Sequence, residues 1–197
     1  MSMKLLETDL LPNEAVIASK KANLIISINE SGLSRFAFDQ YMGFIGMKGK
    51  ESIGGKVYLT NHRIIFKSHF FNRVRGKHSI LLANILDISS TFNNLIVNTP
   101  TKKYELVMWF KTSFMEAINE QISILNKSKI EELKSLILKH PDCIGSGLTK
   151  WTTLNTINQI CLYSSKPSSL LDDFHGVDAN NYLEILEFFK NNLTEEN

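Results

Sequence analysis

Residues 54–67 read GGKVYLTNHRIIFK, and this stretch decides the fold of the chain. Apolar and polar side chains alternate on both sides of a Thr-Asn-His-Arg corner, which is typical of two short antiparallel strands joined by a tight turn. Because successive side chains of a strand point to opposite faces, the apolar ones gather on one face. They are Val57, Leu59, Ile64 and Phe66. We therefore predict a hairpin with one buried face, which indicates a β-barrel rather than a catalytic motif.

The same two-residue period recurs on both sides of this hairpin. Residues 22–26 follow a Pro-Asn turn and are rich in β-branched side chains, so they are predicted to form the first strand. Apolar runs at 79–82, 85–89 and 95–99 predict further strands. Residues 104–110 complete a second hairpin, and their shared face holds Tyr104, Leu106, Met108 and Phe110.

Helical spacing replaces this period after a polar Thr112-Ser113 start. The apolar residues at that spacing are Phe114, Ile118, Ile122 and Leu125. The order is therefore six or seven short strands and then one amphipathic helix, which is the order expected of a small barrel with a capping helix.

Two motifs carry a family resemblance. Residues 54–66 resemble the central motif of the GRAM domain, a membrane-associated relative of the pleckstrin-homology (PH) fold, and Leu11-Pro12-Asn13-Glu14 resembles the opening of that domain. The resemblance spans roughly residues 11–125. It implies an α+β fold, namely a PH-like (GRAM) β-barrel of about seven strands capped by a helix. It also implies a binding module for phosphoinositides or proteins rather than an enzyme.

The chain after the barrel has a helical pattern. We predict a GRAM/PH-like domain over residues 1–126 and an α-helical C-terminal extension over residues 127–197. Ile130, Leu133 and Ile137 share one helical face that ends at His140-Pro141, residues 143–150 are expected to be a loop, and 151–163 have mostly helical spacing. A last helix, capped by Asp178, has a broad apolar face between Tyr182 and Phe189. Residues 36–50 fit either a strand or an insertion.

Charge is distributed unevenly along the chain. Residues 52–86 hold six basic side chains and no acidic one, whereas residues 170–197 hold seven acidic side chains against one lysine. Such blocks act on anionic surfaces or on each other. No window is apolar enough to span a membrane, and Cys143 and Cys161 fit no zinc or redox spacing. These features predict a cytoplasmic protein with buried thiols that reaches membranes only peripherally.

The best candidate site is the basic and aromatic segment 67–78, with a neighbouring pair of lysines. Cationic side chains bind lipid phosphates and aromatic rings enter the interfacial layer, and each basic residue contributes about 1 kcal/mol on an anionic leaflet. The predicted charge contacts are Lys67, Arg73, Arg75, Lys77, Lys102 and Lys103, and the predicted wedges are Phe70 and Phe71. The alternative is a solvated hairpin tip with both Phe rings in the core. Residues 42–50 are a second apolar wedge by the same reasoning, or else an edge strand packed inward.

Other classes of site are disfavoured by spacing. A Cys-x5-Arg phosphatase motif at Cys143 needs arginine at position 149, where this chain has Thr149. His62, His69 and His78 match no compact ligand motif, so we expect no metal and no cofactor. The basic patch is short and the tail acidic, so nucleic acid is not the expected partner.

Two functions remain from the sequence. The first is a non-enzymatic peripheral module for anionic lipid or phosphoinositide, whose acidic tail competes with lipid for the basic segment, so that deleting residues 170–197 strengthens membrane binding. The alternative is a protein-interaction scaffold or a homodimer that uses the C-terminal helices.

Overall fold

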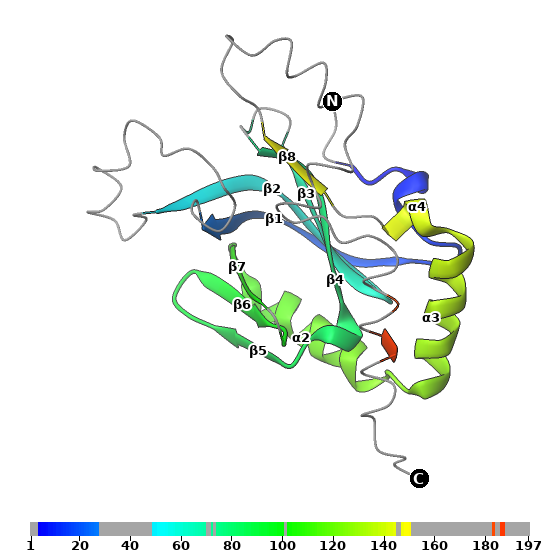
Figure 1. Cartoon of the computed structure of the whole chain (residues 1–197). Coiled ribbons are helices and arrows are strands. Elements are labelled where there is room, and N and C mark those ends of the chain that lie inside the picture. Colours follow the sequence, from blue (N-terminus) through cyan, green and yellow to red (C-terminus); the bar gives the residue numbers. More distant parts are fainter. Residues whose placement is uncertain are drawn as a thin grey trace, which may run out of the picture.

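The structure is a computed structural model that describes residues 4–27, 49–69, 72, 74–100, 102–144, 147–150, 183, 186 and 187 (Figure 1). Its elements are, in chain order, η1 (Glu7–Asp9), β1 (Val16–Ser27), β2 (Lys50–Thr60), β3 (Arg63–Ser68), β4 (Val74–Leu81), η3 (Leu82–Asn84), β5 (Asp87–Ser90), β6 (Asn94–Asn98), β7 (Lys103–Val107), α2 (Lys111–Ser123), α3 (Lys127–Lys139), α4 (Pro141–Ile144) and β8 (Gly147–Lys150). The described strands form one antiparallel sheet in the order β5-β6-β7-β1-β2-β3-β4-β8.

The predicted hairpin at 54–67 is confirmed as β2 and β3. Val57 pairs with Phe66 and Leu59 with Ile64, and all four side chains are buried in the main core. The register depends on Gly55, because a Cβ there would lie 2.4 Å from the Lys67 carbonyl oxygen and 2.7 Å from the Phe66 ring. The strand after Gly55 can therefore approach β3 closely only while position 55 has no side chain.

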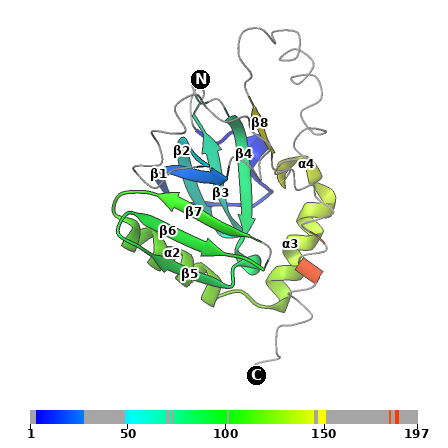
Figure 2. The same ribbon diagram turned by 60° about the vertical axis from the view of Figure 1, so that its left-hand side comes forward.

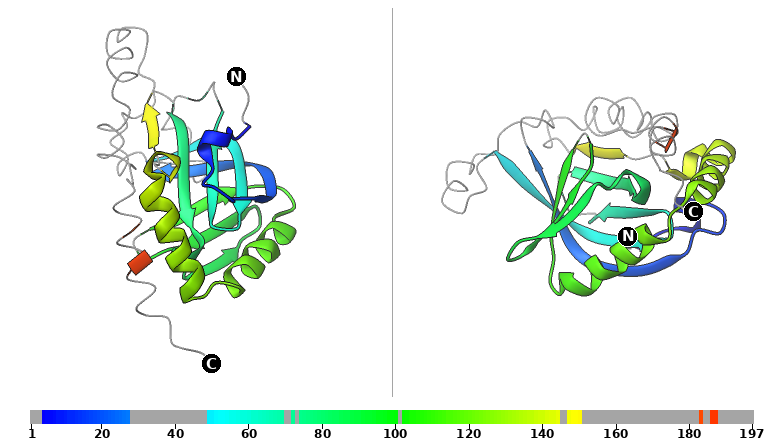
Figure 3. Two further views of the ribbon diagram at one scale, coloured as in Figure 1. Left: turned by 90° about the vertical axis from the view of Figure 1, so that its right-hand side faces the viewer. Right: turned by 90° about the horizontal axis from the view of Figure 1, so that it is seen from below.

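The sheet bends so that its two halves enclose one core, with α2 across an opening (Figures 2 and 3). Strands β5–β7 cross the other strands at a steep angle in both views. From α2, Phe114 and Ile118 enter this core and are fully buried, as the helical spacing predicted. The α+β class and the PH-like barrel with its capping helix are thereby confirmed.

The outer face of β2–β4 is also covered, which the sequence did not predict. Ile65 has no exposed surface and Tyr58 is 5% exposed, although both lie opposite the main core. A second apolar cluster joins this face to the N-terminal segment, α3 and α4; it contains Leu11, Leu81, Ile130, Leu133, Ile137, Ile144 and Leu186. The predicted apolar face of α3 is therefore correct, and α3 lies along the side of the sheet (Figure 3).

Two local predictions are wrong. β7 ends at Val107, and Phe110 is 84% exposed with a left-handed backbone (φ 52°, ψ 47°) instead of sharing the strand's buried face. The expected loop at 143–150 contains the end of α4 and strand β8, which pairs with β4. The extension after residue 126 is therefore not helical throughout, because β4 has an open edge that a passing segment can satisfy with backbone hydrogen bonds.

Several predictions lie outside the described residues. They concern the wedge at 42–50 and the segment 36–50, both up to residue 48, the helix at 151–163 and most of the last helix. From that helix Leu183, Leu186 and Glu187 are described and helical, and Leu186 is fully buried. No helix in the described part of the chain has the length and apolar character needed to cross a membrane.

Candidate functional site

At one end of the barrel β1, β3 and β6 end and β2, β4 and β7 begin. Ser27 pairs with Lys50 at the end of β1–β2, Lys67 pairs with Lys77 near the β3–β4 turn, and Asn98 pairs with Lys103 at the β6–β7 turn. Ile25 pairs with Glu105, which puts the start of β7 beside the end of β1. We call this end, where β1, β3 and β6 end and β2, β4 and β7 begin, the turn end.

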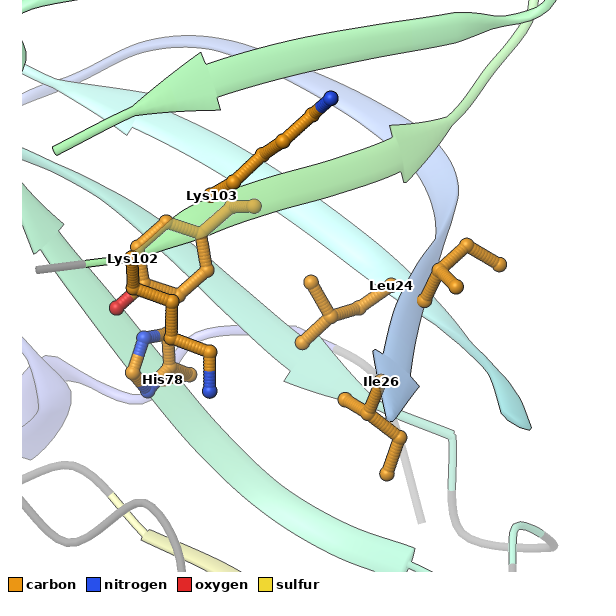
Figure 4. A pocket seen from close by; sticks show the side chains of 7 residues that line it. Leu24, Ile26, His78, Lys102 and Lys103 are labelled. Carbon is orange, nitrogen blue, oxygen red and sulfur yellow. The ribbon is translucent and has the colours of Figure 1, made fainter. Parts of the chain in front are cut away.

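A small open pocket lies at the turn end (Figure 4). It is shallow and open to solvent, with a cavity volume of only about 10 Å³, and is lined by Leu24, Ile25, Ile26, His78, Lys102, Lys103 and Tyr104. In Figure 4 the Lys102 side chain lies beside His78, whereas Lys103 extends away from it. The lining is thus apolar on β1 and cationic or aromatic on β4 and β7.

Aromatic contacts organise the cationic side of this pocket. The rings of His78 and Tyr104 have their centroids 5.1 Å apart, and the ammonium group of Lys102 lies 5.8 Å from the Tyr104 ring centroid. Lys103 is exposed. A second cation at the turn end, Lys50, is paired with Glu105 at 3.1 Å. Lys102 and Lys103 therefore form a cationic rim of this pocket, and both are among the lipid contacts predicted from the sequence.

Lys67 and Lys77 lie elsewhere, on the outer face of the sheet. Both donate to the carboxylate of Asp9, Lys67 Nζ to Oδ2 at 2.7 Å and Lys77 Nζ to Oδ1 at 3.1 Å. Lys77 Nζ also donates to the carbonyl oxygen of Cys143 at 3.1 Å, and Lys67 Nζ to that of Lys4 at 3.2 Å. Asp9 bridges two lysines that face each other across adjacent strands, which offsets their repulsion.

The carboxyl group of Asp9 responds strongly to these neighbours. Burial by itself raises the pKa of Asp9, but the hydrogen bonds from Lys67, the Leu6 backbone N–H and Lys77 lower it to about 2, from an ordinary value of 3.8. Asp9 is therefore ionised at neutral pH and ties the N-terminal segment to β3 and β4.

The other predicted residues divide into two groups. Phe70, Phe71 and Arg73 lie outside the described residues. The backbone of Arg75 is part of β4 and pairs with Thr149 of β8, so β8 runs beside the start of β4. The structure thus brings Lys102 and Lys103 together, ties Lys67 to Lys77 through Asp9, and separates these two pairs onto different faces of the barrel.

A buried ion pair was missed by the sequence analysis. Arg63 and Glu14 have no exposed side-chain surface, and Arg63 Nε and Nη2 donate to Glu14 Oε1 and Oε2, both at 2.8 Å. Burial raises the pKa of Glu14, but the hydrogen bonds and charge of Arg63 outweigh this and lower it below its usual value.

The neighbours of this pair complete its hydrogen bonding. Arg63 also donates to the Asp9 carbonyl oxygen at 2.7 Å and to Ser79 Oγ at 3.0 Å, while Thr60 Oγ1 donates to Glu14 Oε1 at 2.8 Å. Glu14 and Arg63 belong to the two motifs that carry the family resemblance. This shared membership was the feature of the sequence from which the ion pair could have been predicted. Each nitrogen of the Arg63 guanidinium group donates a hydrogen bond within the protein. The pair therefore stabilises the fold and has no group left to bind a ligand.

Metal and thiol chemistry finds little support in the part of the chain that is described. No three His, Cys, Asp or Glu side chains there come together in a group that could hold a metal ion. Cys143 is a half-buried thiol outside any disulfide, and Cys161 lies outside the described residues. The described residues of the turn end therefore include no group that could hold a metal ion.

Comparison with known proteins identifies the family. The GRAM domain family model matches residues 4–128. No curated protein matches the chain. A crystal structure of the C-terminal domain of an unknown protein from Leishmania infantum is 16% identical with a TM-score of 0.38, over 56% of this chain and 86% of that one. The Vps36 N-terminal PH domain is 18% identical with a TM-score of 0.37, over 58% of this chain and 83% of that one.

The two solved structures are too distant to say anything about ligands or partners. The family assignment rests on the match over residues 4–128, and the strand order and capping helix agree with it. The chain therefore belongs to the GRAM domain family.

Proposed function

We propose that this domain docks on anionic membrane lipids, phosphoinositides among them, through the turn end of its barrel. GRAM and PH-like domains are generally non-catalytic modules that bind membranes, lipids or proteins. The observation that carries the proposal is the cationic rim of the open pocket, in which Lys102 and the exposed Lys103 stand beside His78 and Tyr104.

The chemistry of this rim suits a phosphate-bearing headgroup. An ammonium group attracts phosphate as a compact point charge, and two lysines beside a shallow opening need no deep cavity to act on a surface. Arg73, which lies between β3 and β4 in the sequence, is proposed as a third cation, and Phe70 and Phe71 as the wedges that enter the interfacial layer.

Lys67 and Lys77 contribute less directly in this proposal. Their ammonium groups are already held by Asp9 and by backbone carbonyls on the outer face. They raise the positive potential of the barrel, but they do not reach the pocket rim. Lipid contact through them would require displacing the Asp9 carboxylate.

A protein-binding role through the last helix has less support. Leu186 is fully buried and packs, with Leu183, on the cluster that includes Ile130 and Ile137. Glu187 is hydrogen-bonded to Lys134 of α3. Part of the apolar face that was expected to bind a partner or a second copy is therefore occupied within the chain.

The regulatory role proposed for the acidic tail needs a refined test. Deleting residues 170–197 also removes Leu186 from the second cluster, so loss of folding would obscure any change in binding. The substitutions Asp172→Asn and Asp173→Asn remove tail charge and keep Leu186. Stronger binding to anionic vesicles in that variant supports competition between tail and lipid, and unchanged binding rejects it.

The docking proposal is tested by co-sedimentation with vesicles of phosphatidylcholine alone, or with added phosphatidylserine or phosphoinositide. The variant Lys102→Glu, Lys103→Glu removes two attractive charges worth about 1 kcal/mol each, so its affinity for anionic vesicles should fall roughly thirtyfold or more. The variant Lys21→Glu, Lys129→Glu makes the same change in net charge at exposed sites away from the turn end and serves as the control.

Loss of binding in the first variant but not in the control supports docking through the turn end. An equal, small effect in both variants would mean that only overall charge matters. Absence of vesicle binding by the wild-type protein rejects the proposal and favours the protein-interaction role.

A further inference from the structure

An aromatic patch lies at the end of the barrel opposite the turn end. Phe92 is 95% exposed, Phe110 is 84% exposed and Trp109 is 81% exposed. Phe92 lies in the β5–β6 turn, and Trp109 and Phe110 lie between β7 and α2. Since β6 runs from the β5–β6 turn to the β6–β7 turn, the patch and the pocket rim lie at opposite ends of that strand.

Polar contacts hold the two segments of the patch together. The Met108 N–H donates to the Asn93 carbonyl oxygen at 3.2 Å. Lys111 Nζ donates to the Phe92 carbonyl oxygen at 2.6 Å and also to that of Thr91. The three rings therefore project from turns whose backbones are fixed, and their exposure is not the result of a loose chain end.

The backbone of Phe110 is costly for a bulky residue. Its φ of 52° and ψ of 47° lie in the left-handed region, which aromatic side chains rarely adopt. This conformation turns the ring outward at the start of α2, although the strand pattern predicted it inside. Strained conformations of this kind persist where the surrounding structure or a function maintains them.

Two lysines lie at the patch. The ammonium group of Lys20 lies 5.9 Å from the Phe110 ring centroid, and that of Lys111 lies against the Phe92 carbonyl. Between residues 88 and 115 the sequence has one acidic residue, Glu105, and its carboxylate is engaged by Lys50 and Asn94. The patch thus combines exposed rings with cations and without a competing free carboxylate in that segment.

We propose that Phe92, Trp109 and Phe110 form a second membrane-contacting surface, which inserts into the interfacial layer of an anionic bilayer. The three rings are 81–95% exposed and so do not lie in a groove, and a bilayer accepts such rings without a complementary pocket. Tryptophan and phenylalanine favour the interfacial layer, and Lys20 and Lys111 complement anionic headgroups.

This inference is independent of the proposed docking through the turn end. The two surfaces are separated by the length of β6, five residues or about 17 Å. Because the two surfaces share no residue, each can be altered without changing the other.

The test uses the intrinsic fluorescence of Trp109 in the full chain. Trp151→Phe leaves Trp109 as the sole tryptophan. On vesicles of phosphatidylcholine and phosphatidylserine its emission should shift to shorter wavelength, and brominated acyl chains should quench it. Phosphatidylcholine alone should produce a smaller response, since the flanking lysines then have no anionic partner.

A second variant tests the rings directly. Phe92→Asn with Phe110→Asn removes two exposed rings, and asparagine tolerates the left-handed backbone at position 110. Vesicle affinity should fall about tenfold or more, given the apolar area withdrawn from the interface. The control is Ile124→Asn with Leu138→Asn, which removes apolar side chains of 46% and 65% exposure at the end of α2 and on α3.

The outcomes separate the two proposals. A Trp109 response that persists in the Lys102→Glu, Lys103→Glu variant supports the patch even if docking through the turn end fails. Vesicle binding without any change in Trp109 emission overturns the patch and leaves the turn end in place. Absence of vesicle binding, or an equal effect of the ring variant and its control, also overturns it.

Discussion

Arg63 and Glu14 form a doubly hydrogen-bonded ion pair with no exposed side-chain surface, and this pair joins the β2–β3 corner to the segment before β1. Buried charges are costly unless they are fully paired, so each partner depends on the other. Through Arg63 the pair also holds the carbonyl oxygens of Asp9 and Cys143. One side chain thus ties the N-terminal segment and α4 to the same strand.

Removing the charge of Glu14 should destabilise the fold strongly. Glu14→Gln leaves the buried Arg63 without its counter-charge, and we expect the free energy of unfolding to fall by about 3–5 kcal/mol. Urea unfolding measures this. Lys50→Gln, which breaks the partly exposed pair with Glu105, is the control and should cost at most about 1 kcal/mol. Similar small losses in both variants would contradict a stabilising role for the buried pair.

Acid should destabilise the protein through Asp9 and Glu14. Both carboxyl groups have pKa values lowered by folding, that of Asp9 from 3.8 to about 2. The unfolded chain therefore binds more protons than the folded one as these groups titrate. Their stabilisation is complete above the unfolded pKa values and is lost as pH falls toward about 2. Melting temperatures between about pH 7 and pH 3 should show this decline.

Asp9→Asn isolates the share of Asp9 in that pH dependence. The variant should be less stable than wild type at neutral pH, and the difference should shrink as the solution becomes acidic, because protonated Asp9 is also uncharged. Other titrating groups, such as His62 with its lowered pKa, are common to both proteins. A difference that stays constant with pH would exclude the ionised bridge to Lys67 and Lys77 as its cause.

The two adjacent glycines of β2 should differ sharply on substitution. A Cβ at Gly55 would lie 2.4 Å from the Lys67 carbonyl oxygen, whereas at Gly54 its nearest neighbour would be Asn23 Oδ1 at 3.4 Å. Gly55→Ala should therefore cost about 1–3 kcal/mol or more through a backbone clash. Gly54→Ala should change stability by less than about 1 kcal/mol. Equal unfolding midpoints for the two variants would contradict the close approach of β2 and β3.

Relief of strain at Phe110 should stabilise the protein. Phe110→Gly places glycine at a φ of 52°, a conformation that costs glycine little, and we expect a gain of about 1 kcal/mol in the free energy of unfolding. Phe92→Gly is the comparison, since no left-handed backbone is relieved there and no gain is expected. Thermal denaturation distinguishes the two, and a loss of stability in Phe110→Gly would show that the exposed ring makes a stabilising contact.

The substitution Leu186→Ala should show how strongly the last helix is bound to the second cluster. Its side chain is fully buried in the second cluster, so Leu186→Ala should cost about 2–5 kcal/mol if that helix unfolds together with the barrel. A smaller loss, with faster proteolysis confined to the C-terminal region, would mean that the helix detaches on its own.

The main core could be predicted because its pattern is local. Val57, Leu59, Ile64 and Phe66 alternate along two strands that one short turn connects, so their common face follows from the two-residue period alone. The faces of α2 and α3 follow equally from helical spacing. The apolar face of each of these elements can be predicted from its own residues, without knowledge of the elements that it packs against.

The outer face could not be predicted because it depends on contacts between distant segments. Alternation marks Ile65 and Lys67 as outward-facing, and nothing nearby in the sequence indicates that α3 and the Asp9 segment cover them. The same dependence on distant contacts explains why lysines that were predicted to act together lie on different faces of the barrel. Lys67 and Lys77 were grouped with the rest of segment 67–78 by sequence proximity, but their side chains bind Asp9, whereas Lys102 and Lys103 line the pocket.

Strand β8 has a consequence for how the sheet can meet other chains. An uncovered β4 would offer a row of backbone donors and acceptors to any extended peptide, and such edges recruit partners or seed aggregates. The segment 147–150 pairs with β4 from Val74 to Lys77 and occupies those groups. A foreign strand reaching this side must first compete with a tethered one, whose effective concentration is high. Strand β8 therefore disfavours strand exchange at the β4 edge.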